Sequence, residues 1–257
     1  MQCCLILPKK GCDIMEKILE VRGLTKLYTT NTGVIDIDFD IFKGDVYGFL
    51  GPNGAGKTTV MKIITGLIRA NKGTVKIFGY DHQQQFEKAM QKVGTIIETP
   101  EAYHYMSGYQ NLKLAARFYQ DIGEKRIEEV LELVGLDNFK NEKVENYSLG
   151  MKQRLGIANA ILSKPDLLIL DEPTNGLDIE GTVEIRNLIQ TLTKESETTF
   201  FISSHLSREI ELICNRVGII HQGKIIKEGL VDDILKGEQS SLETFFIKLM
   251  QENRGEK

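Results

Sequence analysis

The chain has 257 residues, enough for one large domain or two modest ones, and a core of that size needs no disulfide bonds. Its formal net charge is -4 and no basic stripe dominates, so nucleic acid is not an expected partner. Three of the four cysteines fall in the first twelve residues, which argues against a disulfide framework and favours a reducing, cytosolic setting. No apolar run approaches the roughly 18–20 residues that cross a bilayer.

The first residues do not match a secretion signal. Leu5-Ile6-Leu7 is shorter than the ~7–15 apolar residues of a signal peptide, and Lys9-Lys10 follow this run instead of preceding it. We therefore interpret residues 1–14 as a disordered leader or a misplaced start, with Met15 as the alternative beginning of the chain.

The first hundred residues predict a strand-rich region of antiparallel character. Residues 34–41 alternate apolar and acidic side chains, which indicates a half-exposed strand, whereas residues 46–50 indicate a buried one. The full set of expected strands is 18–24, 34–41, 46–50, 74–78 and 93–97, with helices at 59–64 and 87–92.

Glycines and a lysine follow the buried strand in the order of a phosphate-binding loop. Glycines allow backbone N–H groups to turn around an anion, and the start of the next helix favours negative charge. Lys57 adds a cation for the outer phosphates, and the Thr58 hydroxyl is a suitable ligand for Mg²⁺. The pattern G-x-x-x-x-G-K-[ST] is matched by Gly51, Pro52, Asn53, Gly54, Ala55, Gly56, Lys57 and Thr58, and Thr59 follows.

Residues 100–163 show helical periodicity and little strand signal. Apolar side chains recur at helical spacing, first at Leu112, Ala115, Ala116 and Tyr119 and then at Ile127, Val130, Leu131 and Val134. We interpret this stretch as a separate helical subdomain.

Buried strands return at residues 167–170 and 199–202, with a helix at 182–193 between them. Residues 217–220 and 224–226 flank Gln222-Gly223 and predict a hairpin. A last helix begins with the capping-box spacing of Ser240 and Glu243. We expect its apolar face to dock on its own domain, with a membrane or a partner as the alternative; the face consists of Leu242, Phe245, Phe246, Leu249 and Met250.

Two carboxylates end the strand at 167–170. Asp171 falls at the carboxyl tip of a buried strand, where open α/β sheets bind their ligands. It would hold Mg²⁺ through water, whereas Glu172 points elsewhere and can accept a proton from an attacking water. The alternative, an acidic turn after a core strand, is disfavoured by the phosphate-loop pattern upstream.

Three further motifs carry a resemblance to a known family. They are Tyr147–Arg154, Thr174–Asp178 and Ser203–His205. Together with the phosphate loop they resemble the ATP-binding-cassette (ABC) ATPase family over about residues 17–235. The resemblance implies an α/β fold with a P-loop NTPase (RecA-like) core, an antiparallel β subdomain and an inserted α-helical subdomain. It also implies ATP and Mg²⁺ as cofactors.

The resemblance assigns one set of residues to a second copy of the chain. Ser148 and Gly150, at the start of a helix, would bind phosphate oxygens of the nucleotide held by the other copy's phosphate loop. Asp178 would bridge the two copies near the nucleotide.

The resemblance assigns other residues to the nucleotide of the same copy. His205 would contact the γ-phosphate and position both the water and Glu172. Tyr28 lies 23 residues before Gly51, where the family has an aromatic ring that stacks on adenine. An ordinary strand-end tyrosine is the alternative for Tyr28.

Two positions depart from the usual family pattern. Leu149 stands where the signature usually has its middle glycine, and we expect its side chain to face away from phosphate without loss of activity. Glu98 stands where the family usually has glutamine, which exchanges a neutral amide for a full charge without a donor. We assign Glu98 to the metal site and expect it to couple Mg²⁺ binding to the membrane partner. Glu98 with the Tyr147–Met151 motif is similar to the branch of bacterial exporters for bacitracin and lantibiotic-type peptides.

Residues 103–112 combine aromatic and methionine side chains with polar ones, which suits a protein interface. In the family this region faces the groove that receives a short helix of the membrane subunit. A core-facing aromatic cluster is the alternative.

These features predict one ABC ATPase domain: core segments at 15–99 and 164–235, the helical subdomain at 100–163, and a C-terminal helix at 236–257. Two copies would sandwich ATP and power a separate transmembrane permease from the cytoplasmic face of the cell membrane, exporting an antimicrobial peptide or drug. The alternative is a soluble ABC ATPase acting on DNA or ribosomes. DNA-repair members of the family carry a long coiled-coil insertion and translation-factor members carry a second cassette, and this sequence has neither feature. An unrelated phosphate-loop kinase would need neither Ser148-Leu149-Gly150 nor Ser203-Ser204-His205.

Overall fold

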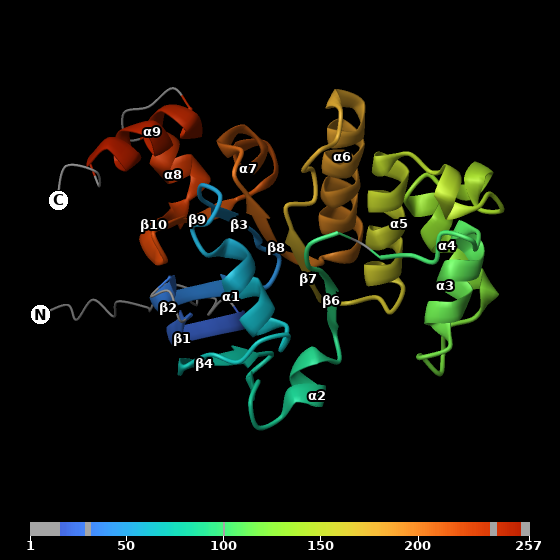
Figure 1. The fold of residues 1–257 in the computed structure, drawn as a ribbon, viewed down its shortest axis with the longest axis horizontal. Helices are drawn as coiled ribbons and strands as arrows, with labels where there is room; N and C mark the ends of the chain where they lie inside the picture. The colour runs from blue at the N-terminus through green and yellow to red at the C-terminus, as the bar shows by residue number, and fades with distance from the viewer. Residues whose placement is uncertain (1–15, 29–31, 100, 237–240, 253–257) are drawn as a thin grey trace, which may run out of the picture.

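The computed structural model describes residues 16–28, 32–99, 101–236 and 241–252. Two sheets with their covering helices form one part of the molecule, and a group of helices around α5 forms the other (Figure 1). The interpretation of residues 1–14 concerns a segment outside the described residues.

A six-stranded sheet forms the centre of the fold, in the order β10-β9-β3-β8-β7-β6. Its strands span, in that order, Lys224–Leu230, Arg216–His221, Val46–Leu50, Thr199–Ser204, Leu167–Asp171 and Val93–Ile96. All run parallel except β10, which forms the expected antiparallel hairpin with β9. β3, β7 and β8 are buried along their whole length, because a parallel sheet is covered on both faces. Their carboxyl ends meet along one edge.

The second sheet is antiparallel, as the opening of the sequence predicts, and has the order β2-β1-β4-β5. Its strands are β1 (Lys17–Leu27), β2 (Gly33–Phe42), β4 (Lys72–Ile77) and β5 (Tyr80–Asp81). In β2, Val34, Ile37, Phe39 and Ile41 are buried and the aspartates between them are more exposed, which confirms the half-exposed strand, although Ile35 is 40% exposed. Helix α1 (Lys57–Ile64) packs between side chains of both sheets in one hydrophobic cluster.

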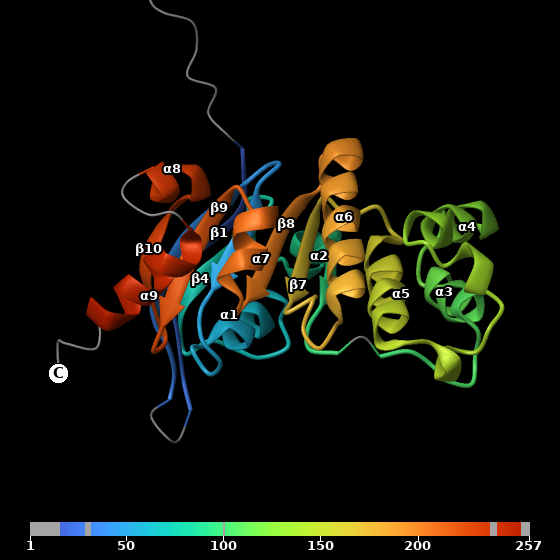
Figure 2. The same ribbon diagram turned by 90° about the horizontal axis from the view of Figure 1, so that it is seen from above.

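The helical stretch contains α3 (Gly108–Ala116), α4 (Glu124–Leu133) and α5 (Leu149–Ile161), with short 3₁₀ turns at Asp137–Phe139 and Val144–Asn146. Figures 1 and 2 both show these helices beside α6, away from the antiparallel sheet. The predicted apolar stripe of α4 is buried, as are Leu112 and Ala116 of α3, whereas Tyr119 lies beyond the end of α3 and is 43% exposed. The buried residues belong to one cluster that continues into β7 through Leu168 and Leu170. The other helices are α2 (Phe86–Met90), α6 (Ile179–Ser196), α7 (Ser207–Ile213), α8 (Val231–Lys236) and α9 (Leu242–Glu252).

Two helix ends show what local periodicity leaves out. Helix α6 begins at Ile179 and not at 182, because the Asp178 carboxylate accepts a hydrogen bond from the Gly181 N–H at 2.8 Å and caps the first turn. Helix α9 docks on its own domain, as expected, with Phe245, Phe246, Leu249 and Met250 packed against the core. The predicted cap residue Ser240 lies outside the described residues, and the Ser241 hydroxyl accepts from the Thr244 N–H at 3.2 Å.

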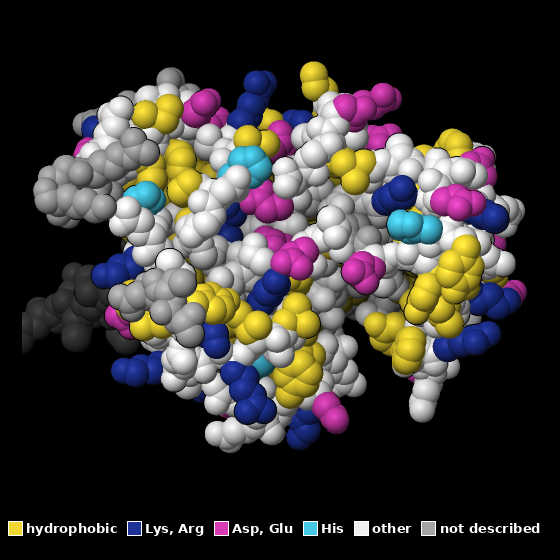
Figure 3. Space-filling model, viewed as in Figure 1, with side chains coloured by type: hydrophobic (Ala, Val, Ile, Leu, Met, Phe, Trp, Pro, Cys, Tyr) yellow, Lys and Arg dark blue, Asp and Glu magenta, His cyan; other side chains and the backbone are white. Residues whose placement is uncertain are grey.

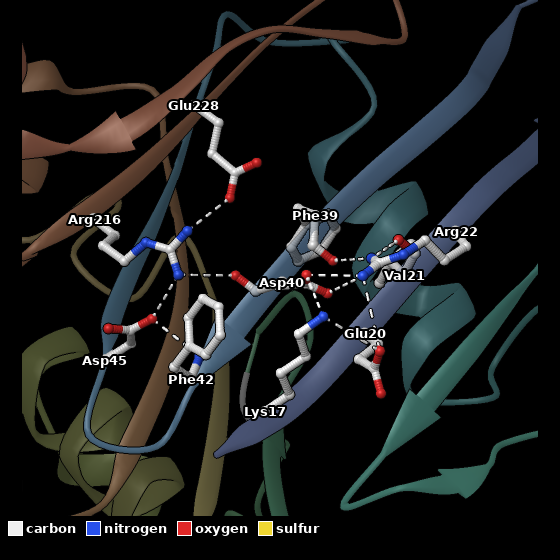
Figure 4. A network of polar contacts seen from close by, with 10 residues as sticks. All are labelled: Lys17, Glu20, Val21, Arg22, Phe39, Asp40, Phe42, Asp45, Arg216 and Glu228. Carbon is white, nitrogen blue, oxygen red and sulfur yellow. Dashed lines mark hydrogen bonds and ion pairs between the residues drawn. The ribbon is translucent and has the colours of Figure 1, made fainter. Parts of the chain in front are cut away.

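A guanidinium joins the two sheets at the start of β9 (Figure 4). Arg216 contacts the Asp45 carboxylate at 3.0 Å, donates to the Asp40 carbonyl at 3.2 Å and contacts the Glu228 carboxylate at 3.1 Å. Its guanidinium also stacks 4.8 Å from the centre of the Phe42 ring. Burial raises the pKa of Glu228, and the positive charge of Arg216 opposes this rise. Strands from both sheets are thereby held in one polar network.

Aromatic rings join the same two sheets from within. Phe39 of β2, Tyr47 and Phe49 of β3 and Phe201 of β8 have ring centres 5.4–5.9 Å apart. Phe201 is fully buried and contacts the other three rings. The group ties the phosphate-loop strand to the antiparallel sheet.

We expect Phe201→Ala to lower the free energy of unfolding by about 3–5 kcal/mol, because it leaves a cavity among three buried rings. The matched control is Phe118→Ala, whose ring is 86% exposed and whose removal should change stability by less than about 0.5 kcal/mol. Denaturant titration followed by circular dichroism measures both. Equal losses in the two variants would contradict this account of the core.

Candidate functional site

The phosphate loop joins β3 to α1 and has the backbone that its glycines predict. Gly54 and Gly56 have φ of 78° and 109°, in the region that favours glycine. A Cβ on Gly56 would lie 2.4 Å from Val34 Cγ1, so close approach of β2 also requires glycine there. Gly56 is the N-cap of α1, and the free N–H groups of the first turn therefore adjoin the loop.

Segments far away in sequence hold this loop in place. The Gly223 N–H donates to the Ala55 carbonyl at 3.0 Å, and the Gly51 N–H donates to the Ser204 carbonyl at 3.2 Å. The Ile35 N–H in turn donates to the Gly223 carbonyl at 2.8 Å. The β9–β10 turn thus lies between the loop and β2. The sequence predicts this turn but not its contact with the loop.

Lys57 carries a buried positive charge inside the loop. Its side chain is 5% exposed, and Nζ donates to the carbonyls of Gly51 and Pro52 at 2.7 and 3.3 Å. Nζ also lies 3.0 Å from Glu172 Oε1, an ion pair that offsets the cost of burying the charge. The loop lysine and the predicted proton acceptor are therefore in direct contact.

Glu172 links Lys57 to the predicted switch histidine. While Oε1 faces Lys57, Oε2 lies 2.7 Å from His205 Nδ1. Glu172 has φ of 49°, a conformation that costs a non-glycine residue of order 1–3 kcal/mol and persists where surrounding contacts hold it. The structure thus brings together Lys57, Glu172 and His205, which come from three different segments of the sequence.

Asp171 is 4% exposed and has a partner that sequence analysis missed. The Ser203 hydroxyl, at the end of β8, donates to Asp171 Oδ1 at 2.5 Å and accepts from the Glu172 N–H at 2.9 Å. The available signal was a polar side chain in an otherwise apolar buried strand. The ligand types fit Mg²⁺, since Thr58 and Asp171 offer hard oxygen atoms. Among the described residues no group of three or more His, Cys, Asp or Glu is arranged to hold a metal, so nucleotide and water oxygens would complete the shell.

Ser148, Gly150 and Asp178 lie at helix starts outside this cluster. Ser148 and Asp178 are exposed N-caps of α5 and α6, and the Ser148 hydroxyl accepts from the Met151 N–H at 3.2 Å. A Cβ on Gly150 would lie 3.9 Å from Gly181 Cα, so the two helix starts adjoin. Within the described part of one copy, no hydrogen bond or ion pair joins these residues to the phosphate loop.

Glu98 and Tyr28 lie at the margins of the site. Glu98 is 64% exposed and pairs with Lys62 of α1 at 2.6 Å. It also lines a cavity of about 730 Å³ together with Asp171 and Glu172. Tyr28 is 43% exposed at the end of β1, with Lys26 Nζ 5.7 Å from its ring centre. The roles predicted for these two residues stay predictions.

The loop, the buried lysine and the carboxylates at the ends of parallel strands define a phosphate-loop NTPase. The family model described as "ABC transporter" matches residues 34–175. The chain belongs to the ABC transporter family and is an ABC-type transport ATPase. The fold predicted from sequence is confirmed, and so is the resemblance to bacitracin- and lantibiotic-type relatives.

Curated relatives and a solved structure support this assignment. The chain is 45% identical to the bacitracin transport ATP-binding protein BcrA of Enterococcus faecalis, over 87% of this chain and 72% of the relative. It is 40% identical to the lantibiotic transport ATP-binding protein SrtF of Streptococcus pyogenes, over 92% of this chain and 100% of the relative. A solved "ATP binding subunit of ABC transporter" aligns with a TM-score of 0.79 at 29% identity, covering 91% of this chain and 99% of that one.

Over the described residues, no helix combines the length and apolar character that crossing a bilayer requires.

We expect Gly56→Ala to weaken ATP binding at least tenfold, because the new methyl group meets Val34 and the backbone leaves its glycine conformation. Gly44→Ala is the control: Gly44 also has positive φ, at 79°, but a Cβ there meets nothing within 4 Å. The control should lose about 1–2 kcal/mol of stability and keep its ATP affinity. Titration with a fluorescent ATP analogue measures affinity, and equal weakening in both variants would contradict the proposed fit.

Proposed function

We propose that this chain binds and hydrolyses ATP to power a separate membrane permease that exports an antimicrobial peptide or drug. The observation that carries the hydrolytic part is the contact of Glu172 with both Lys57 and His205 at the edge of the central sheet. The proposed cargo is inferred from two relatives that are named as bacitracin and lantibiotic transport proteins. Those names give no support to the alternative of an ATPase acting on DNA or ribosomes.

Different residues of the site have different roles in hydrolysis. The loop N–H groups and Lys57 bind the phosphates, Glu172 accepts the proton of the attacking water, and His205 orients Glu172 and contacts the γ-phosphate. Mg²⁺, when bound by Thr58 and Asp171, neutralises phosphate charge. Tyr28 stacks on the base, which tolerates different bases because each has a π-face.

A second copy completes each site. Ser148 is exposed and Gly150 half-buried at the start of α5, and among the described residues neither makes a polar contact with its own phosphate loop. Their N–H groups suit phosphate oxygens of a nucleotide on the facing copy. Asp178, at the adjoining start of α6, bridges the two copies. The two nucleotides are sandwiched between the copies.

The permease contacts the helical end of the molecule. Figure 3 shows hydrophobic side chains at the surface of this end, and Tyr103, Tyr105 and Phe118 are 52%, 69% and 86% exposed. The exposure of Tyr103 and Tyr105 favours the interface interpretation of residues 103–112 over the core-facing cluster. The protein would then sit at the cytoplasmic face of the membrane through its permease.

Glu172→Gln should keep ATP binding and lower turnover by about 10²–10⁴-fold, because an amide cannot accept the proton of the attacking water. Phosphate release and binding of a fluorescent ATP analogue are the two measurements. Glu87→Gln, an exposed change on α2, is the control with wild-type turnover expected. Wild-type turnover in Glu172→Gln would show that Glu172 is not the proton acceptor.

In the Glu172→Gln background, ATP should drive two copies into a stable dimer, because closure is not followed by hydrolysis. Adding Gly150→Arg should abolish this dimer and leave ATP binding by each copy intact. Gly123→Arg is the control, since Gly123 also begins a helix but has open space around it. Light scattering with and without ATP measures the mass; a dimer that persists with Gly150→Arg would exclude the sandwich arrangement.

Glu98 is proposed to tune the metal site through its cavity position and its ion pair with Lys62. Glu98→Gln should shift the Mg²⁺ concentration that gives half-maximal hydrolysis, because it removes the carboxylate that pairs with Lys62 of α1, the helix that begins at the phosphate loop. Glu101→Gln removes a carboxylate that lines the same cavity and is the control. An unchanged Mg²⁺ dependence and unchanged transport with Glu98→Gln would refute this role.

A further inference from the structure

Ser203, to which the Ser203–His205 motif assigns no role of its own, contacts both Asp171 and Glu172. It lies on β8, directly paired in register with Asp171 on the neighbouring strand β7. Its side chain is fully buried, so water does not compete for the hydroxyl. The two hydrogen bonds of this hydroxyl seen among the described residues are both to the protein.

The polarity of the two hydrogen bonds is fixed by chemistry. The Glu172 N–H can act only as a donor, so at 2.9 Å it donates to Ser203 Oγ. The hydroxyl proton is then available for Asp171 Oδ1 at 2.5 Å, and an ionised carboxylate accepts it. The short distance is that of a charge-assisted bond. One oxygen atom thus acts on Asp171 as a donor and on Glu172 as an acceptor.

Both bonds constrain groups that the reaction uses. The bond to Asp171 fixes the rotation of a carboxylate whose free oxygen would face Mg²⁺. The bond to the Glu172 backbone holds a residue with φ of 49°, from which the side chain reaches Lys57 and His205. In the part of the chain that the structure describes, Ser203 Oγ is the only acceptor of the Glu172 N–H, while the Glu172 carbonyl accepts from the Asn175 N–H at 3.0 Å.

We propose that Ser203 is a positioning residue that sets the orientation of Asp171 and Glu172 together. The proposal rests on the proposed function, because it requires those two carboxylates to act on nucleotide and water. It predicts that removing the hydroxyl impairs the chemical step and metal use while leaving the phosphate loop, and so ATP binding, intact.

Ser203→Ala removes a single oxygen atom. We expect kcat to fall about 10–100-fold, as for other residues that orient metal ligands, with KM for ATP changed less than about twofold. The Mg²⁺ concentration for half-maximal rate should rise. Ser203→Thr restores a hydroxyl in a side chain suited to a strand, and should recover most of kcat.

The matched control is Thr199→Val at the other end of β8. Thr199 is also buried, and its hydroxyl likewise accepts from a backbone N–H, that of Gly44 at 3.1 Å. Removing the Thr199 hydroxyl should lower the stability about as much as removing the Ser203 hydroxyl, but it should leave kcat and the Mg²⁺ dependence unchanged. Ser203→Cys adds a second comparison, because a thiol of similar size is a weak donor. If Ser203→Ala does not fold, the Cys and Thr variants are compared instead. A kcat of Ser203→Cys that is well below that of Ser203→Thr then supports the proposal.

The outcomes separate this proposal from the proposed function. Wild-type kcat and Mg²⁺ dependence in Ser203→Ala, with Glu172→Gln inactive, overturn the role of Ser203 alone. Equal kcat in the Cys and Thr variants overturns it as well. Wild-type turnover in both Ser203→Ala and Glu172→Gln overturns the assignment of the catalytic carboxylates, whereas absence of ATP hydrolysis in the wild-type protein overturns the proposed function. If Thr199→Val loses as much activity as Ser203→Ala, the loss is explained by lower stability, and the positioning role of Ser203 is contradicted.

Discussion

The structure depends on one buried positive charge, that of Lys57. A lysine with 5% of its side chain exposed is costly unless its charge is met by acceptors. The carbonyls of Gly51 and Pro52 and the carboxylate of Glu172 supply them. This arrangement requires β3 and β7 to end at the same edge of the sheet. The parallel order of the central sheet is therefore what makes the site.

The loop is also held from outside its own strand and helix. Gly223 bonds to Ala55, Val34 of β2 packs on Gly56, and Ile35 bonds back to Gly223. The antiparallel sheet thus supports the loop directly. Arg216 and the aromatic rings around Phe201 join the same two sheets elsewhere. The conformation of a short loop is consequently maintained by contacts spread over most of the β structure.

Charge and exposure distinguish two kinds of residue around the nucleotide site. Asp171 and Ser203 are buried and hydrogen-bonded to each other, whereas Ser148 and Asp178 are exposed at helix starts. Buried groups keep a fixed geometry for chemistry, and exposed helix starts have N–H groups that remain available to a ligand. This division agrees with the proposal that a second copy completes the site.

The sequence by itself determined the phosphate loop, the buried strands and the Asp171-Glu172 pair, because each depends on residue types that are adjacent in the chain. Periodicity also predicted the antiparallel opening and the apolar face of α9, whereas the tertiary structure decided that this face docks on its own domain. The sequence did not determine that Ser203 bonds to Asp171, that Glu98 pairs with Lys62, or that Gly223 supports the loop. Those contacts join segments up to 168 positions apart, as Ala55 and Gly223 are, and no local pattern encodes them. Strand order and register decided them, since they bring distant residues to the same edge of one sheet.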